Sequence, residues 1–102
     1  MVKLIAMYRQ PEDKAAFDHH YTNVHLPLAK KMPGLQKIEI TKVLGTPMGT
    51  DADYYIMAEM YFADEEALKA SMSTPDGKAA AKDVMGFAGN IVYMMIGDVV
   101  EG

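Results

Sequence analysis

The sequence predicts one α+β domain over residues 1–102, in which four strands form an antiparallel sheet and two helices cover one of its faces. Three observations predict this fold: the order of strand and helix patterns, one helical stripe of apolar residues, and strands that are apolar on both faces. The chain has 102 residues, 50% of them hydrophobic and 24% charged, which is the size and composition of a single globular domain.

The beginning of the chain predicts a strand followed by a helix. Residues 2–9 form an apolar run that ends at Gln10-Pro11, which indicates a strand. A helix is predicted over residues 14–32, because large apolar side chains follow one helical stripe at Phe17, Tyr21, Val24, Leu28 and Met32. Pro27 lies inside this helix and cannot donate a hydrogen bond to the carbonyl of Asn23, so we expect the helix to kink or loosen there.

The rest of the chain predicts three more strands and a second pair of helical segments. Residues 35–44 alternate between apolar and polar side chains, as a strand does, and residues 45–53 are rich in Gly, Pro and Asp and predict a loop. The remaining predicted elements are a strand over 54–63, a helix capped by Asp64 that ends at Met72, a helix begun by Thr74-Pro75 that ends near Val84, a turn over 85–90 and a strand over 91–100. The order β-α-β-β-α-β is that of the ferredoxin-like fold.

Two helices can cover only one face of this sheet, yet the third and fourth strands are apolar on both faces. The fourth strand, for example, places Tyr93 and Met95 on one face and Met94 and Ile96 on the other. A bare face of this kind is a larger apolar patch than monomers usually tolerate. We therefore predict a homodimer whose two sheets pack face to face, with a cavity lined by Tyr and Met between them.

The composition excludes several classes of protein. The chain has no Cys, which excludes a disulfide scaffold, a thiolate metal site and a cysteine nucleophile. A net charge of −4 argues against nucleic acid as a partner. No uncharged run is long enough for a membrane span, and the apolar run between Lys3 and Arg9 is too short for a signal-peptide core. These features predict a cytoplasmic protein with no membrane partner. Its 10 Met residues either fill the core or line an adaptable ligand site.

The densest polar cluster lies just before Pro27. Tyr21 and His25 are four residues apart and therefore share a helical face. His25 is a candidate general base or hydrogen-bond donor, with the Tyr21 hydroxyl orienting it or the ligand. The alternative is a histidine whose ring nitrogens are satisfied by the backbone near the kink. The spacing of His19, His20 and His25 is poor for one metal ion, so we predict no metal site and expect His19 and His20 to be solvated.

Further candidates lie in the third strand and the last helix. Glu59 lies within an apolar strand and on the same face as Tyr55, so its carboxylate needs a partner such as Lys37, Lys42 or a tyrosine hydroxyl. If that face lines a cavity, Tyr55 and Glu59 are candidate ligand-binding residues; if it faces the helices, Glu59 forms a structural ion pair. Asp83 ends the last helix, where a carboxylate opposes the helix dipole, and a hydrogen bond into the next turn would explain it.

Two regions of the chain resemble the EthD family, which is named for ethyl tert-butyl ether degradation. The resemblance is carried by Phe17-Asp18-His19-His20-Tyr21, His25-Leu26-Pro27-Leu28-Ala29, Ser73-Thr74-Pro75-Asp76-Gly77 and Lys82-Asp83-Val84 through Phe87. It implies a ferredoxin-like fold that dimerises into an α/β barrel. The positions that it carries over are Tyr21, His25, Pro27, Leu28, Asp83 and Phe87, so Asp83 and Phe87 join the candidate ligand-binding residues.

The resemblance also limits the expected function. Related dimeric barrels include cofactor-independent monooxygenases, polyketide cyclases, lactone isomerases and haem enzymes, and the haem branch needs an axial histidine in a larger domain. We expect a cofactor-free enzyme that binds a hydrophobic carbonyl or phenolic compound in a barrel cavity. His25 would abstract a proton next to a carbonyl or assist oxygenation. A protein that only sequesters such a compound and a structural dimer with a filled barrel are the alternatives.

Overall fold

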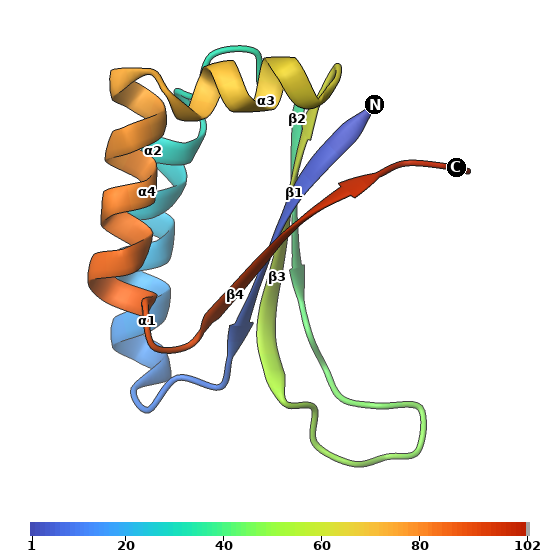
Figure 1. Ribbon diagram of the computed structural model, residues 1–102. Coiled ribbons are helices and arrows are strands. Elements are labelled where there is room, and N and C mark those ends of the chain that lie inside the picture. The colour runs from blue at the N-terminus through green and yellow to red at the C-terminus, as the bar shows by residue number, and fades with distance from the viewer. Residues whose placement is uncertain (102) are drawn as a thin grey trace.

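The computed structural model describes residues 1–101 and arranges them in two layers, a sheet and a set of helices that covers one of its faces (Figure 1). The strands pair antiparallel in the order β2-β3-β1-β4. Their bounds are β1 Val2–Arg9, β2 Lys37–Lys42, β3 Tyr54–Phe62 and β4 Val92–Asp98. This is the ferredoxin-like α+β topology, so the predicted fold class is confirmed.

The helical layer contains two groups of segments, separated in the sequence by β2 and β3: α1 Lys14–His20, the π-helical turn η1 Tyr21–His25 and α2 Leu26–Ala29, and then α3 Glu65–Met72 and α4 Pro75–Ala88. The last two helices begin where the sequence predicts. The Asp64 carboxylate accepts a hydrogen bond from the Ala67 amide at 2.8 Å, and the Thr74 hydroxyl accepts one from the Gly77 amide at 3.1 Å. Among residues 1–101, no helix is both long and apolar enough to cross a bilayer.

The first helix changes its geometry just before its proline. In η1 the Leu26 amide bonds to the carbonyl of Tyr21, five residues back, in place of the usual four. A proline ring crowds the carbonyl four residues before it in a regular helix, and the wider turn ahead of Pro27 relieves this contact. The predicted loosening of the helix at Pro27 is confirmed.

The helix α4 is longer than the sequence predicts. It continues to Ala88, so the predicted end near Val84 and the predicted turn over residues 85–90 are wrong. The buried residues Gly77, Ala80, Val84 and Ala88 follow one helical stripe, and this stripe continues past Val84. Burial of the last turn outweighs the low helix propensity of the glycine within it.

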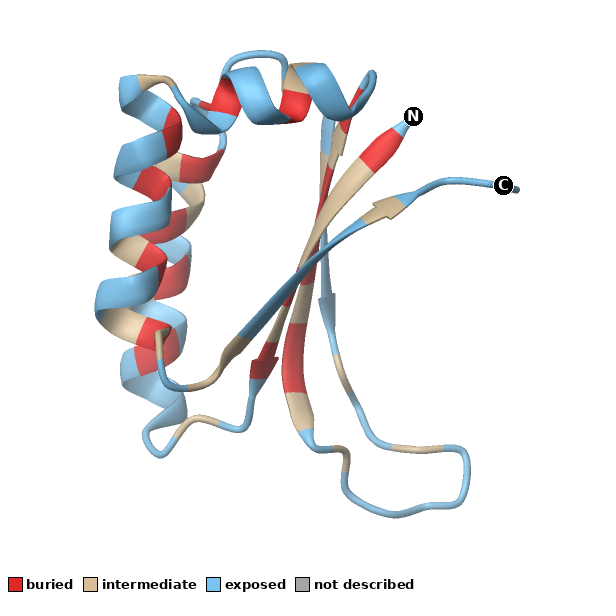
Figure 2. Cartoon of the chain, viewed as in Figure 1, coloured by how far each residue is buried: buried red, intermediate tan, exposed pale blue. Residues whose placement is uncertain are grey.

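The core lies between the helices and the sheet, where the buried positions of both layers face each other (Figure 2). Phe62 on β3 and Leu68 on α3 have no exposed surface. The register of the strands places Leu4, Ala6 and Tyr8 on the same side as Met60. This side of the sheet carries the floor of the site described below.

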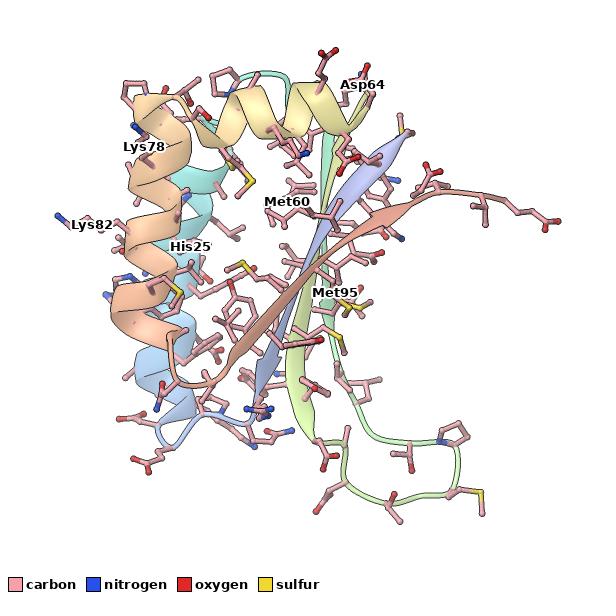
Figure 3. The ribbon with its side chains drawn as sticks, viewed as in Figure 1. His25, Met60, Asp64, Lys78, Lys82 and Met95 are labelled. Carbon is pink, nitrogen blue, oxygen red and sulfur yellow. The ribbon has the colours of Figure 1, made fainter. Side chains whose placement is uncertain are left out.

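The opposite, helix-free face of the sheet carries an apolar patch beside charged side chains. The pairing register places Ile5, Met7, Met57, Tyr93 and Met95 in the patch, and Lys3, Lys37, Glu39 and Glu59 on the same face. Tyr93 is 55% exposed and Met95 37% exposed, and Figure 3 shows Met95 on the side of the sheet away from the helices. The prediction that β3 and β4 carry apolar side chains on both faces is confirmed.

Candidate functional site

A cavity of about 70 Å³ lies between the sheet and the helices. Its lining comes from the sheet (Leu4, Ala6, Tyr8, Met60, Met94), from the first helix and the turn after it (His25, Ala29, Met32), and from α3 and α4 (Met72, Gly77, Ala80, Ala81, Val84). His25 and the Tyr8 hydroxyl are the polar side-chain groups among these residues. Figure 3 shows His25 in the helical layer and Met60 on the side of the sheet that faces it. The cavity is therefore an apolar space with one imidazole in its wall.

A carboxylate on α4 holds the His25 ring. The Asp83 Oδ2 atom lies 3.0 Å from His25 Nδ1, and because a carboxylate can only accept, Nδ1 carries the proton of the neutral ring. The lone pair is then on Nε2, which has no hydrogen-bond partner within residues 1–101. His25 is 6% exposed, and its burial lowers the pKa of the ring below its ordinary value, while Asp83 acts in the opposite direction. A buried, neutral and oriented imidazole of this kind is suited to accept a proton.

A second imidazole binds the same carboxylate. His20 Nε2 lies 2.9 Å from Asp83 Oδ1 and 3.1 Å from Oδ2, so His20, which we expected to be solvated, is partly buried and bound to a carboxylate. In a regular helix His20 and His25 would point to different sides, but the π-helical turn between them aligns residues five apart. His19 is exposed and lies 3.2 Å from the Asn23 side chain, so its expected exposure is confirmed.

Asp83 lies inside α4, five residues before its end, and not at the terminus that the sequence predicts. Its carboxylate meets two histidines of the first helix, and the predicted hydrogen bond into a following turn is replaced by these contacts. Phe87 follows one turn later, with its ring centroid 4.3 Å from His20 and 5.4 Å from His25. Asp83 and Phe87 thus lie behind His25 and outside the cavity lining.

The two buried tyrosines near His25 have different positions. Tyr21 is 3% exposed and packs its ring 5.5 Å from His25, without lining the cavity. Tyr8 lies in the cavity wall, with its ring 5.4 Å from Tyr21. Burial raises the pKa of both hydroxyls, so both are neutral phenols near pH 7 and Tyr8 can donate a hydrogen bond. Sequence reasoning missed Tyr8, although the alternation of the first strand puts it beside Leu4 and Ala6.

Tyr55 and Glu59 lie away from His25 and from each other. The Tyr55 hydroxyl donates to both oxygens of Asp18 at 2.9 Å, at the end of the sheet near the start of α1. Glu59 lies on the helix-free face, where it is paired with Lys3 at 2.5 Å. The sequence placed both on one face, but the register of β1 against β3 shifts after Tyr8 and leaves Tyr55 on the helical side.

Within the described part of the chain, no three His, Asp or Glu side chains are arranged to hold a metal ion. His20, Asp83 and His25 are instead joined by hydrogen bonds, with one carboxylate between two imidazoles. This arrangement is suited to proton transfer.

Comparison with known proteins gives a consistent result. A 53% identical EthD family protein of Bacillus halodurans c-125 has a solved structure that superposes with a TM-score of 0.93, over 96% of this chain and 97% of that one. An uncharacterized 11.0 kDa protein from the thcB-thcC intergenic region of Rhodococcus erythropolis is 32% identical over 98 residues, which are 96% of this chain and 94% of that protein.

Two solved structures of low identity share the fold alone. A hydroxynitrile lyase from Passiflora edulis is 14% identical with a TM-score of 0.78, and SnoaB, a cofactor-independent oxygenase from Streptomyces nogalater, is 13% identical with a TM-score of 0.70. Each comparison covers 99% of this chain and 94% of the other. The family model of the EthD domain matches residues 9–90, which include His20, His25 and Asp83. The chain therefore belongs to the EthD family, as its two resembling regions indicated.

Proposed function

We propose that the protein binds a neutral, hydrophobic compound with a carbonyl or phenolic group in the cavity, and that His25 removes a proton from it. The placement of His25 carries this proposal. Its Nδ1 is held by Asp83 at 3.0 Å, and its Nε2 is unpaired in a residue that lines an apolar cavity. The proton moves from a C–H or O–H of the ligand to Nε2, and the electron pair stays on the ligand as an enolate or phenolate.

The surroundings of His25 favour this step. Asp83 stabilises the imidazolium that forms when the ring takes up a proton, and the new anion lies next to that positive charge. The Tyr8 hydroxyl is the donor in the wall that can bind the developing oxyanion. Since no Lys or Arg lines the cavity, a ligand that enters with a carboxylate or phosphate would leave its charge unpaired, and a neutral ligand is favoured.

The methionines determine how large a ligand the cavity accepts. At about 70 Å³ it is smaller than the few hundred Å³ of a typical ligand pocket. Met32, Met60, Met72 and Met94 are in its wall, and Met72 and Met94 are each 41% exposed. Methionine side chains are unbranched and flexible, so a ring-sized ligand enters by displacing them.

The comparisons support a role in small-molecule metabolism. The hydroxynitrile lyase and the cofactor-independent oxygenase are enzymes of small molecules built on the same fold. The proton transfer proposed for His25 uses groups of the chain alone and needs no cofactor. An enolate or phenolate formed in this way is a starting point for isomerisation, cyclisation or oxygenation. A cytoplasmic location, as expected from the sequence, is part of this proposal.

The apolar helix-free face supports the homodimer expected from the sequence, which is also part of this proposal. Tyr93 and Met95 lie exposed on this face, and its Lys3–Glu59 pair is already satisfied within the chain. A second copy packed on this face by a twofold axis would bury the apolar patch. The cavity beside His25 lies on the other side of the sheet, within one copy. The cavity predicted between two sheets is therefore distinct from the proposed site.

A binding protein without turnover is the second candidate. The observation that favours it is that, among residues 1–101, His25 is the only group in the cavity wall, apart from the neutral phenol of Tyr8, that can accept or release a proton. Many complete reactions need a second acid or base to return the proton to another atom of the substrate. In this second function His25 and Tyr8 would orient a hydrophobic ligand by hydrogen bonds.

Exchange of carbon-bound hydrogen separates the two functions. Phenylacetone and α-tetralone, two neutral ketones that contain an aromatic ring, are incubated with the protein in D₂O, and loss of the proton next to the carbonyl is followed by ¹H NMR. We expect the protein to accelerate exchange above the buffer rate, and His25→Gln to remove the acceleration. His19→Gln is the matched control, because His19 is exposed and has no contact with Asp83.

Thermal shift with the same ketones completes the experiment. A ketone that raises the melting temperature of the wild type without any accelerated exchange would support the binding protein. Acceleration that survives in His25→Gln would overturn the assignment of His25 as the base. Neither binding nor exchange with either ketone would count against the proposed ligand class.

A further inference from the structure

One carboxylate joins two histidines that differ in their access to solvent. The His25 side chain is 8% exposed and lines the cavity, whereas the His20 side chain is 33% exposed. His20 and Asp83 also line an open groove on the outer surface, together with Lys82, which Figure 3 shows pointing away from the sheet. Asp83 therefore connects a ring inside the cavity with a ring that reaches solvent.

The two imidazole rings share the single negative charge of Asp83. With one ring protonated, the Asp83 charge is balanced; with both protonated, the cluster carries a net positive charge, and the second proton is bound less readily than the first. The His20 side chain keeps more contact with solvent than the His25 ring, so a positive charge on His20 is better hydrated than one on His25. The Phe87 ring packs on both imidazoles and covers part of the cluster.

We propose that His20 is a positioning residue, which holds Asp83 from the solvent side and, when protonated, keeps His25 in its neutral, proton-accepting form. This inference rests on the proposed role of His25 as a base. Without His20, the Asp83 charge would be available to His25 alone, and His25 would become protonated, and unable to accept a proton from the ligand, at a higher pH. With His20 present, His25 remains able to act as a base down to a lower pH.

The other titratable and charged groups around the two rings affect the protonation of these rings less than Asp83 does. The titratable and charged groups that face His20 are Asp83 and Lys82 on α4 and Glu12 and Asp13 before α1. Those that face His25 are Asp83, His20, Tyr8 and Tyr21, and both tyrosines stay neutral below pH 10. Glu12 and Asp13 are exposed, so solvent screens their effect more strongly than that of Asp83, which lies in hydrogen-bond contact.

An NMR titration of the whole, ligand-free protein tests this inference. Histidine rings labelled with ¹³C and ¹⁵N are followed with pH in the wild type, in His20→Gln and in the control His19→Gln. We expect the wild-type His25 signal to titrate at lower pH than an ordinary imidazole, because burial lowers its pKa. His20→Gln should move the His25 midpoint upward and leave a single-step curve, and His19→Gln should leave it in place.

The outcomes separate this inference from the proposed function, because the titration uses no ligand. A His25 midpoint that is unchanged or lower in His20→Gln would overturn the role of His20, whatever the ketone experiment gives. If His20→Gln does not fold, as judged by its amide spectrum, the wild-type curves decide alone. A His25 curve without any influence of a second titrating group would contradict the inference.

Discussion

His25 and Asp83 are 58 positions apart in the sequence, and their side chains meet at 3.0 Å where the first helix packs on α4. The contact forms where η1 and α2 pack against α4, on which Ala80 and Val84 are buried. The Thr74 cap fixes where α4 begins, and with it the position of Asp83 along this helix. A local sequence signal therefore helps to set the position of a long-range contact in the candidate site.

The buried, neutral His25 predicts how stability depends on pH. Burial lowers the folded-state pKa of His25 below the unfolded value of about 6.5, so the unfolded chain binds more protons near and below that pH. This part of the stability is present above about pH 6.5 and is lost as the pH falls through the folded pKa. We expect His25→Gln to lose less melting temperature than the wild type between about pH 7.5 and about pH 5.5.

Differential scanning calorimetry of the two proteins measures this difference, with His19→Gln as the control. An equal drop in His25→Gln and in the wild type would show that His25 does not contribute to the acid sensitivity of the fold.

The proposed homodimer predicts that a charge on the helix-free face separates the copies. Met95→Lys places an ammonium group on the part of this face that β4 forms next to β1, where a twofold interface over the apolar patch would bury it. Met85→Lys is the matched control, because Met85 is 56% exposed on α4, away from this face. Sedimentation equilibrium at micromolar concentration should give dimers for the wild type and Met85→Lys, and an 11.2 kDa species for Met95→Lys. A wild type of 11.2 kDa would contradict the dimer.

Much of the fold is predictable because it depends on local periodicity. The sequence signals that predicted it connect residues close to one another in the chain: the stripe from Phe17 to Met32, the Asp64 and Thr74 caps and the strand alternation. The end of α4 was missed because Gly86 reads as a helix stop, whereas burial of Ala88 continues the helix. That burial depends on the sheet, which no local pattern describes.

The site was predictable only in part. The spacing of Tyr21 and His25 before Pro27 pointed to His25 as the candidate base, because both the helical face and the disruption are local features. The pairing of His20 with Asp83 was not predictable by α-helical spacing, since only the π-helical turn aligns His20 with His25. A known π-turn before the proline would have been the signal that places both rings on one side.

Two glycines of α4 predict opposite effects of the same substitution. A Cβ at Gly77 would overlap the carbonyl of Ser71 and lie 2.9 Å from the Cα of Met72, so Gly77→Ala should destabilise the protein by about 1–3 kcal/mol. A Cβ at Gly86 meets nothing within 4 Å, and Gly86→Ala should stabilise it by about 0.5–1 kcal/mol through helix propensity. Urea unfolding measures both, and a stable Gly77→Ala protein would show that α3 and α4 pack less closely than described.

Substitution of two carboxylates, Asp83 beside His25 and Glu59 on the helix-free face, tests where the proposed reaction takes place. Asp83→Asn removes the charge that stabilises protonated His25, and an amide cannot accept from both imidazoles as the carboxylate does. Ketone exchange should fall about a hundredfold, the usual scale for an impaired general base.

Glu59→Gln removes a carboxylate of similar burial that is paired with Lys3 on the helix-free face. It should leave exchange within about twofold of the wild type and lower only the stability, since the sheet separates it from the cavity. Equal losses of exchange in both variants, measured at matched fractions of folded protein, would place the reaction on the helix-free face and not beside His25.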